Sequence, residues 1–153
     1  MNAEYHRNCC QAVADLIEAA RQANPNGAGF KDLQPTKVMD SYDGNLAASP
    51  VAITYLMAQA QPEGGSMRRD DWKFPVVAAV HTSGVLSGNR AGPEPTDFLG
   101  AIAGLFHGKR PAGLPSEVWK CEIDPQGMAA TDEAKYQNLS AATVVVLTAR
   151  LNR

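Results

Sequence analysis

Three side chains that can bind a metal ion lie within one helical turn near the start of the chain. His6, Cys9 and Cys10 are spaced i, i+3 and i+4, so a helix could present them together, with Cys121 as a fourth ligand. Structural zinc sites usually draw closely spaced pairs of ligands from two loops, and this chain lacks such pairs. Cys9 also falls on an apolar helical stripe. The pattern therefore favours buried thiols, and we predict no metal and no other cofactor.

Nucleophilic catalysis would need a base beside a serine, and His81, Ser83 and Ser87 are the residues that could be combined for it. The Gly-x-Ser-x-Gly sequence of a nucleophile elbow does not occur. Acidic residues are scattered, and none forms an evident pair for acid-base chemistry. We interpret His81 and Ser83 as the polar end of a strand and predict no catalytic residue.

The segment from Gly104 to Arg110 superficially resembles a phosphate-binding loop. It has no Ser or Thr after Lys109, its leading glycine has the wrong spacing, and it ends an expected helix instead of opening one. The segment is more typical of a helix C-terminus, where basic residues are favoured by the helix dipole.

Length and composition fit one compact domain over residues 1–153. The chain has 44% hydrophobic residues, enough to fold without disulfides or a metal, and its net charge of −2 disfavours sequence-specific nucleic-acid binding. Three cysteines are too few for a disulfide framework, which indicates a reducing compartment. We find neither a signal-peptide pattern nor an apolar run long enough for a membrane span, so we expect an unexported protein without membrane contact.

Two helices are predicted from periodicity and end signals. Ala3 to Ala23 contains no Gly or Pro and carries apolar residues at helical spacing; Pro25 and Gly27 follow it. The second helix opens after Pro95, with Thr96 as its expected N-cap, and stops at Gly108.

Four runs have the character of strands: Pro50–Met57, Phe74–His81, Val118–Ile123 and Thr143–Arg150. A short extra strand is expected at Thr36–Met39. We therefore predict an α+β fold, in which a mostly antiparallel sheet of four to five strands has both helices packed on one face.

The connector Gln61–Asp71 is longer than an ordinary hairpin loop, so we expect it to have a role beyond turning the chain. Its balanced charges, Arg68, Arg69, Asp70 and Asp71, suit polar contacts at the rim of an interface. The next residue, Trp72, and Trp119 stand at strand ends, where a tryptophan either packs inward or anchors an interface. We predict Arg68, Arg69, Asp70, Asp71 and Trp72 as interface residues.

Taken in order, these segments resemble the tail terminator, or tail-completion, proteins of tailed bacteriophages. The resemblance lies in the N-terminal amphipathic helix, the hairpin whose second strand begins Phe74-Pro75-Val76, the helix around Asp97–Phe106, the segment Val118-Trp119-Lys120-Cys121 and the apolar last strand from Leu139 to Arg150. The resemblance covers about residues 2 to 150, and it rests on the order of these segments and on their pattern of apolar and polar residues.

The resemblance implies a non-enzymatic virion protein that is assembled in the host cytoplasm. It implies a homo-hexameric ring that caps the tail tube protein, stops its polymerisation and joins the neck or connector protein, with the sheath protein as a further partner in contractile tails. A head-tail stopper or neck adaptor is a closely related alternative. A small ligand-binding domain or enzyme that uses His81 and the Gly84–Pro95 loop is the alternative from another class.

Overall fold

The structure is a computed structural model that describes residues 2–42, 46, 49–56, 59–65, 69–82, 92–124 and 138–152, with the backbone alone at residues 2, 63–65, 69, 70 and 152. Two α-helices, one 3-10 helix and six strands occupy these ranges. Their bounds are α1 Asn2–Ala23, η1 Ala28–Phe30, β1 Gln34–Met39, β2 Val51–Tyr55, β3 Gln61–Gly65, β4 Arg69–His81, α2 Pro95–Phe106, β5 Val118–Asp124 and β6 Leu139–Asn152.

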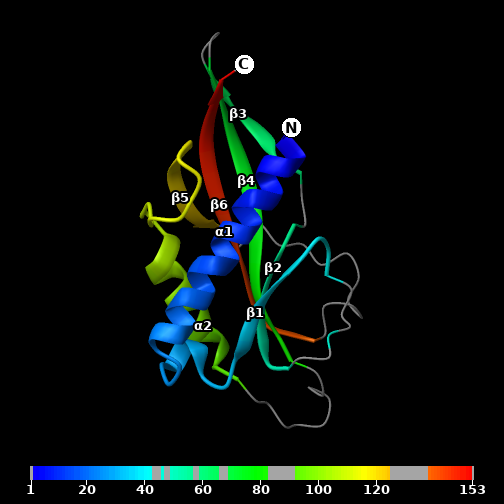
Figure 1. The fold of residues 1–153 in the computed structure, drawn as a ribbon, viewed down its shortest axis with the longest axis vertical. Coiled ribbons are helices and arrows are strands. Elements are labelled where there is room, and N and C mark those ends of the chain that lie inside the picture. The colour runs from blue at the N-terminus through cyan, green and yellow to red at the C-terminus, as the bar shows by residue number, and fades with distance from the viewer. Residues whose placement is uncertain are drawn as a thin grey trace.

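The six strands form one sheet, in which five follow the order β1-β2-β4-β6-β5 and β3 is added beside β4 (Figure 1). β1 and β2 run parallel, and every other pairing is antiparallel. β3 pairs with the first half of β4, while β2 pairs with its second half. The runs at residues 50–57 and 74–81, expected to pair as a hairpin, do pair antiparallel, as β2 and β4. The short strand expected at residues 36–39 is also present and begins two residues earlier.

Two details of the sequence prediction were wrong. The sheet has six strands, because the connector forms β3 and the first residues of β4 instead of a loop. Pro, Gly and Asp have low strand propensity, but β3 pairs with β4, and the first residues of β4 pair with the long β6; these pairings override that preference. In α2, Thr96 is not the N-cap: Glu94 occupies that position without a side-chain capping bond, and Pro95 opens the helix.

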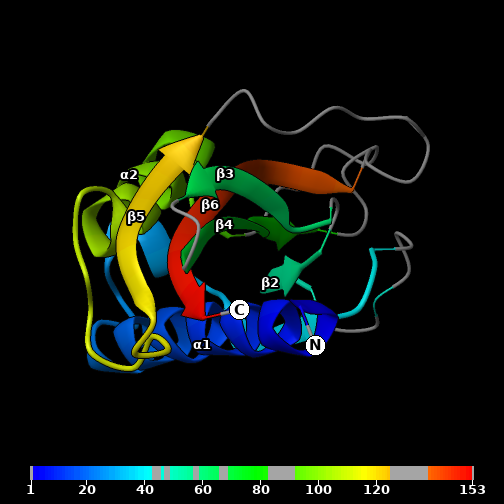
Figure 2. The same ribbon diagram turned by 90° about the horizontal axis from the view of Figure 1, so that it is seen from above.

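The two helices share one face of the sheet, as predicted. Alternate residues of β4 point into the core that α1 and α2 also line: Phe74, Val76, Ala78 and Val80. Val77 and Ala79 point the other way and pack with Tyr42, Tyr55 and Val144 in a smaller cluster. Figure 2 shows α1 running along one side of the curved strands. The α+β fold with its helices on one face is therefore confirmed.

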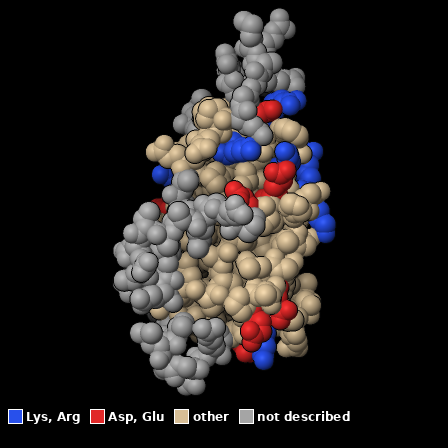
Figure 3. All heavy atoms as spheres, turned by 180° about the vertical axis from the view of Figure 1, so that it is seen from behind, with Lys and Arg blue, Asp and Glu red and all other residues tan. Residues whose placement is uncertain are grey.

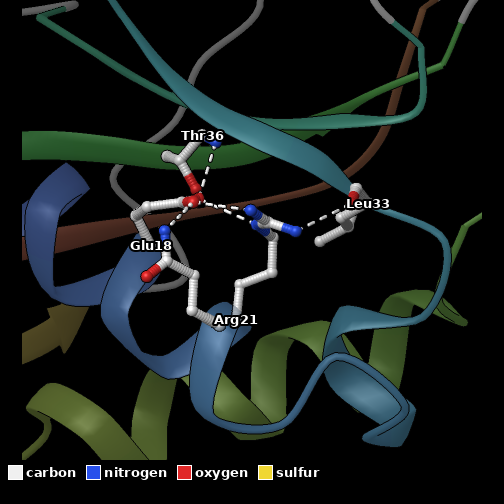
Figure 4. A network of polar contacts seen from close by, with 5 residues as sticks. Glu18, Arg21, Leu33 and Thr36 are labelled. Atoms are coloured by element: carbon white, nitrogen blue, oxygen red, sulfur yellow. Dashed lines mark hydrogen bonds and ion pairs between the residues drawn. The ribbon is translucent and has the colours of Figure 1, made fainter.

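Polar contacts fix α1 against the edge strand β1. Glu18 of α1 receives two bonds from Arg21, at 2.8 and 2.6 Å, and one at 2.9 Å from the backbone N–H of Thr36 (Figure 4). Arg21 also donates to the carbonyl of Leu33. The Arg21 guanidinium, with the Thr36 N–H, lowers the pKa of Glu18 to about 2. Glu18 thus ties the helix to the strand and occupies an edge N–H of β1.

A close approach between η1 and α2 depends on Gly29. A Cβ atom at this position would lie 2.6 Å from the Cβ of Ala101 and 2.9 Å from the carbonyl oxygen of Asp97. We expect Gly29→Ala to lower the free energy of unfolding by about 1–3 kcal/mol, because the helices must move apart. Gly100→Ala is the matched control: nothing lies within 4 Å of its Cβ position, so helix propensity should raise stability by about 0.5–1 kcal/mol. Equal stabilities in urea unfolding would contradict the close approach.

Burial of His6 makes the attachment of α1 to β4 sensitive to acid. Its Nε2 donates a 2.6 Å hydrogen bond to the carbonyl of Pro75, and burial lowers the pKa of the ring below its ordinary 6.5. The unfolded chain therefore takes up the proton first. Stability should be retained above pH 6.5 and should fall below it, by at most about 1.4 kcal/mol per pH unit.

The acid effect can be isolated with His6→Gln, which retains a donor but does not titrate. The difference in unfolding free energy between wild type and His6→Gln should shrink as the pH falls from 7 to 5. Chemical denaturation at a series of pH values measures it. Parallel pH profiles for the two proteins would show that His6 does not titrate with unfolding.

Candidate protein interface

The clearest surface feature of the fold is a three-stranded extension, which we call the arm. It comprises residues 61–65 of β3, 69–73 of β4 and 148–152 of β6. β4 lies in the middle, paired with Thr148–Asn152 on one side and with Gln61–Gly65 on the other. In Figure 1 the arm extends past the N-terminal end of α1. Only the outer end of the arm therefore lies beyond α1, since Ala149 is buried in the main core and Trp72 and Leu151 pack against it.

The predicted interface residues lie in or beside this arm. Arg68 is outside the described residues, and Arg69 and Asp70 are described as backbone within β4. Trp72 is half-buried and packs against the main core on the helix side. Asp71, its neighbour in the strand, faces the opposite side. The structure therefore separates the two side chains that sequence reasoning had grouped together.

Asp71 belongs to a cluster that crosses three strands. Its carboxylate accepts two hydrogen bonds from Arg150 of β6, at 2.9 and 3.4 Å, and the two residues are directly paired in the ladder. The Arg150 guanidinium lies 5.3 Å from the ring centre of Trp119 on β5. The same guanidinium lowers the pKa of Asp71, and a hydrogen bond from the Trp119 side chain lowers it further.

Trp119 is 46% exposed, although its indole is in contact with the Arg150 guanidinium. An irregularity in the pairing of β5 with β6 falls at this residue, between Val118 and Lys120. Such bulges redirect side chains. Arg150 stacks on the Trp119 ring and is itself held by the ion pair with Asp71, so the ring is restricted before any partner binds. Exposed Trp and Arg side chains held in this way are typical anchors of protein interfaces.

Arg150 was not among the predicted interface residues. Sequence shows only a basic residue near the end of an apolar strand; its partners depend on the register of β4, β5 and β6. Opposite charges on two strands that are expected to pair were the available signal, but register is not readable from composition.

A hollow of about 440 Å³ lies on the sheet face opposite the helices. Its apolar floor includes Pro75, Val144 and Val146, and its polar lining is formed by Gln61, Lys73, Glu122 and Asp124. Lys120 pairs with Glu122 at 3.2 Å beside it. In Figure 3, charged side chains of both signs adjoin each other on the upper part of this face. The mixed apolar and charged lining of the hollow suits contact with a polypeptide and does not indicate one particular class of ligand.

The residues considered for metal binding lie in the core. Cys9, Cys10 and Cys121 are free and buried, and burial raises the pKa of Cys9 and of Cys121 to about 12. Cys10 donates to the hydroxyl of Thr54, and His6 to Pro75. Within the described ranges, no three His, Cys, Asp or Glu side chains gather to hold a metal ion.

The other chemical candidates are placed as follows. His81 is buried, and its Nδ1 is hydrogen-bonded to the Tyr42 hydroxyl at 2.7 Å. Ser83 and Ser87 lie outside the described residues. α2 ends at Phe106 and is followed by Gly108 in the left-handed region, so the expectation of a helix C-terminus there is confirmed.

Neither the known protein families nor the curated proteins include a significant match to this sequence. No helix in the described part of the chain is long and apolar enough to cross a bilayer.

Proposed function

We propose that this chain is a virion protein that forms a hexameric ring on the tail tube of a tailed phage, ends polymerisation of the tube and joins the tail to the neck or connector. Where the tail is contractile, the same ring meets the sheath. The protein acts by contact and not by catalysis, in the virion, after assembly in the host cytoplasm.

The observation that carries the proposal is the arm combined with an ordered surface cluster. The outer end of the arm extends past α1, and β4, β5 and β6 bring Asp71, Arg150 and Trp119 together on the sheet face opposite the helices. A projecting sheet can reach a neighbouring subunit, and a preorganised Trp–Arg pair reduces the ordering cost of binding. The order of helices and strands that resembles the tail terminators supports the same function.

A head-tail stopper or neck adaptor remains the related alternative, since it would use the same kind of ring. The hollow of about 440 Å³ is the observation that favours a small ligand-binding domain or an enzyme, because its size is that of small-molecule sites. The described residues that line it include no His or Cys, and the buried His81 lies in a different part of the sheet. We therefore favour the ring-forming protein.

The ring can be tested with purified protein and isolated tail tubes from the virus that encodes the chain. Electron microscopy of the mixture should show one six-fold ring at one end of each tube. A tube end left uncapped at saturating protein concentration would contradict the proposal. Six-fold rings found on the connector and not on the tube would favour the stopper or adaptor.

A further inference from the structure

The turn that follows α2 contacts the outer edge of β5, the last strand in the order of the sheet. Figure 2 shows α2 beside the end of β5. The N–H of Gly108 donates to the carbonyl of Cys121 at 2.9 Å, and Nδ1 of His107 accepts from the N–H of Ile123 at 3.1 Å. Alternate residues of an edge strand direct both backbone groups outward, so Cys121 and Ile123 each have one of these groups covered.

The bond to Ile123 determines the protonation state of the imidazole. A backbone N–H can only donate, so Nδ1 of His107 must offer a lone pair, and the imidazole is neutral with its proton on Nε2. Protonation places a hydrogen on Nδ1 and converts this acceptor into a second donor. The hydrogen bond between His107 and Ile123 therefore cannot survive protonation of the imidazole.

His107 differs in this respect from the other two histidines of the chain. His6 donates to the carbonyl of Pro75, and a protonated imidazole can donate in the same way. His81 is bonded to the hydroxyl of Tyr42, and a hydroxyl can either donate or accept. Of these three contacts, the one made by His107 is the one whose partner excludes a charged imidazole.

Charged residues of both signs belong to the two segments that meet here. Lys109 and Arg110, which follow α2, both donate to backbone carbonyls. On β5, Lys120 pairs with Glu122 at 3.2 Å, and Asp124 is the other charged residue of the strand. The carboxylates titrate at lower pH than an ordinary histidine. A variant changed at residue 107 alone is therefore needed to separate protonation of the imidazole from titration of these groups.

We propose that His107 is an acid-sensitive cover for the edge of β5. Its backbone is held in place, because its own N–H donates to the carbonyl of Ala103 and the next N–H donates to that of Cys121, both at 2.9 Å. On protonation the imidazole alone moves away, and the N–H of Ile123 is exposed to solvent at the edge of the sheet. Acid thus opens one covered edge position without unfolding α2. The device operates whether or not the chain forms a hexamer.

NMR spectroscopy of the isotopically labelled full chain between about pH 8 and pH 5, where histidine changes its charge, tests the proposal. The amide signal of Ile123 should move with the same midpoint as the ring signals of His107. After correction for the intrinsic pH dependence of exchange, the Ile123 amide should lose about three- to tenfold of its protection in acid, as expected for one hydrogen bond. The Gly108 amide, whose partner is a carbonyl, should keep its protection.

His107→Asn is the matched control, because the side-chain oxygen of asparagine is an acceptor that does not titrate. In this variant the Ile123 amide signal should lose its pH dependence. His107→Ala removes the acceptor, so its Ile123 amide should be as weakly protected in neutral solution as that of the wild type in acid. Two results would overturn the proposal: an Ile123 amide that titrates equally in His107→Asn, or one that stays protected while the wild-type imidazole is protonated.

Discussion

Phe74→Ala should lower the free energy of unfolding by about 3–5 kcal/mol, the largest loss that we expect from one substitution. Phe74 is fully buried near the middle of β4, beneath α1. Its ring centre lies 4.9 Å from that of Tyr5 and 5.4 Å from that of His6. Truncation removes these contacts and leaves a cavity between helix and sheet.

Because domains of this size are stable by about 5–15 kcal/mol, the Phe74→Ala variant should unfold at much lower urea concentration. Phe74→Leu is the control, with an expected loss of about 1–2 kcal/mol because most of the apolar volume remains. Urea titration followed by tryptophan fluorescence measures both losses. A loss below 1 kcal/mol for the alanine variant would show that α1 does not pack on β4 as described.

The second large effect concerns tail joining. Replacing Arg68, Arg69, Asp70 and Asp71 together by Ser should leave the chain folded, because charged side chains rarely belong to an apolar core. The same change should reduce joined, infectious particles by about a hundredfold or more, since each tenfold requires only about 1.4 kcal/mol of lost contact. Complementation of a virus that lacks the chain, with circular dichroism of the purified variant, measures both properties.

Two comparisons make this result specific. Asp15, Lys31, Glu94 and Lys109 changed to Ser remove the same balance of charges away from the arm and should leave joining normal. Asp71→Ser alone separates two roles, because it breaks the ion pair with Arg150 and leaves the other three residues intact. Normal infectivity of the variant with Ser at residues 68–71 would show that these four residues do not contact a partner during tail joining.

Much of the fold was predictable because periodicity reports burial directly. The apolar stripe of α1, the β-branched run in β6 and the glycine after α2 each specify a local structure that packing then retains. β3 was missed because Gln61-Pro62-Glu63-Gly64-Gly65 has the composition of a turn. Its strand geometry comes from pairing with β4, which is a non-local cause.

The candidate interface was predictable only in part, for the same reason. Asp71 was predicted as an interface residue from its place in the long connector, and Trp72 from its place directly after it, but alternation along β4 sends their side chains to opposite faces. The cluster around Arg150 depends on the register of three strands that are distant in the sequence. Local sequence does not encode that register, whereas the folded sheet does.

Electron microscopy of tails assembled without this chain tests the central claim most directly. If the protein caps the tube, its removal should give tubes of uncontrolled length that carry no head, and supplying the wild-type chain should restore uniform, joined tails. Tails of normal length attached to heads in its absence would contradict the account.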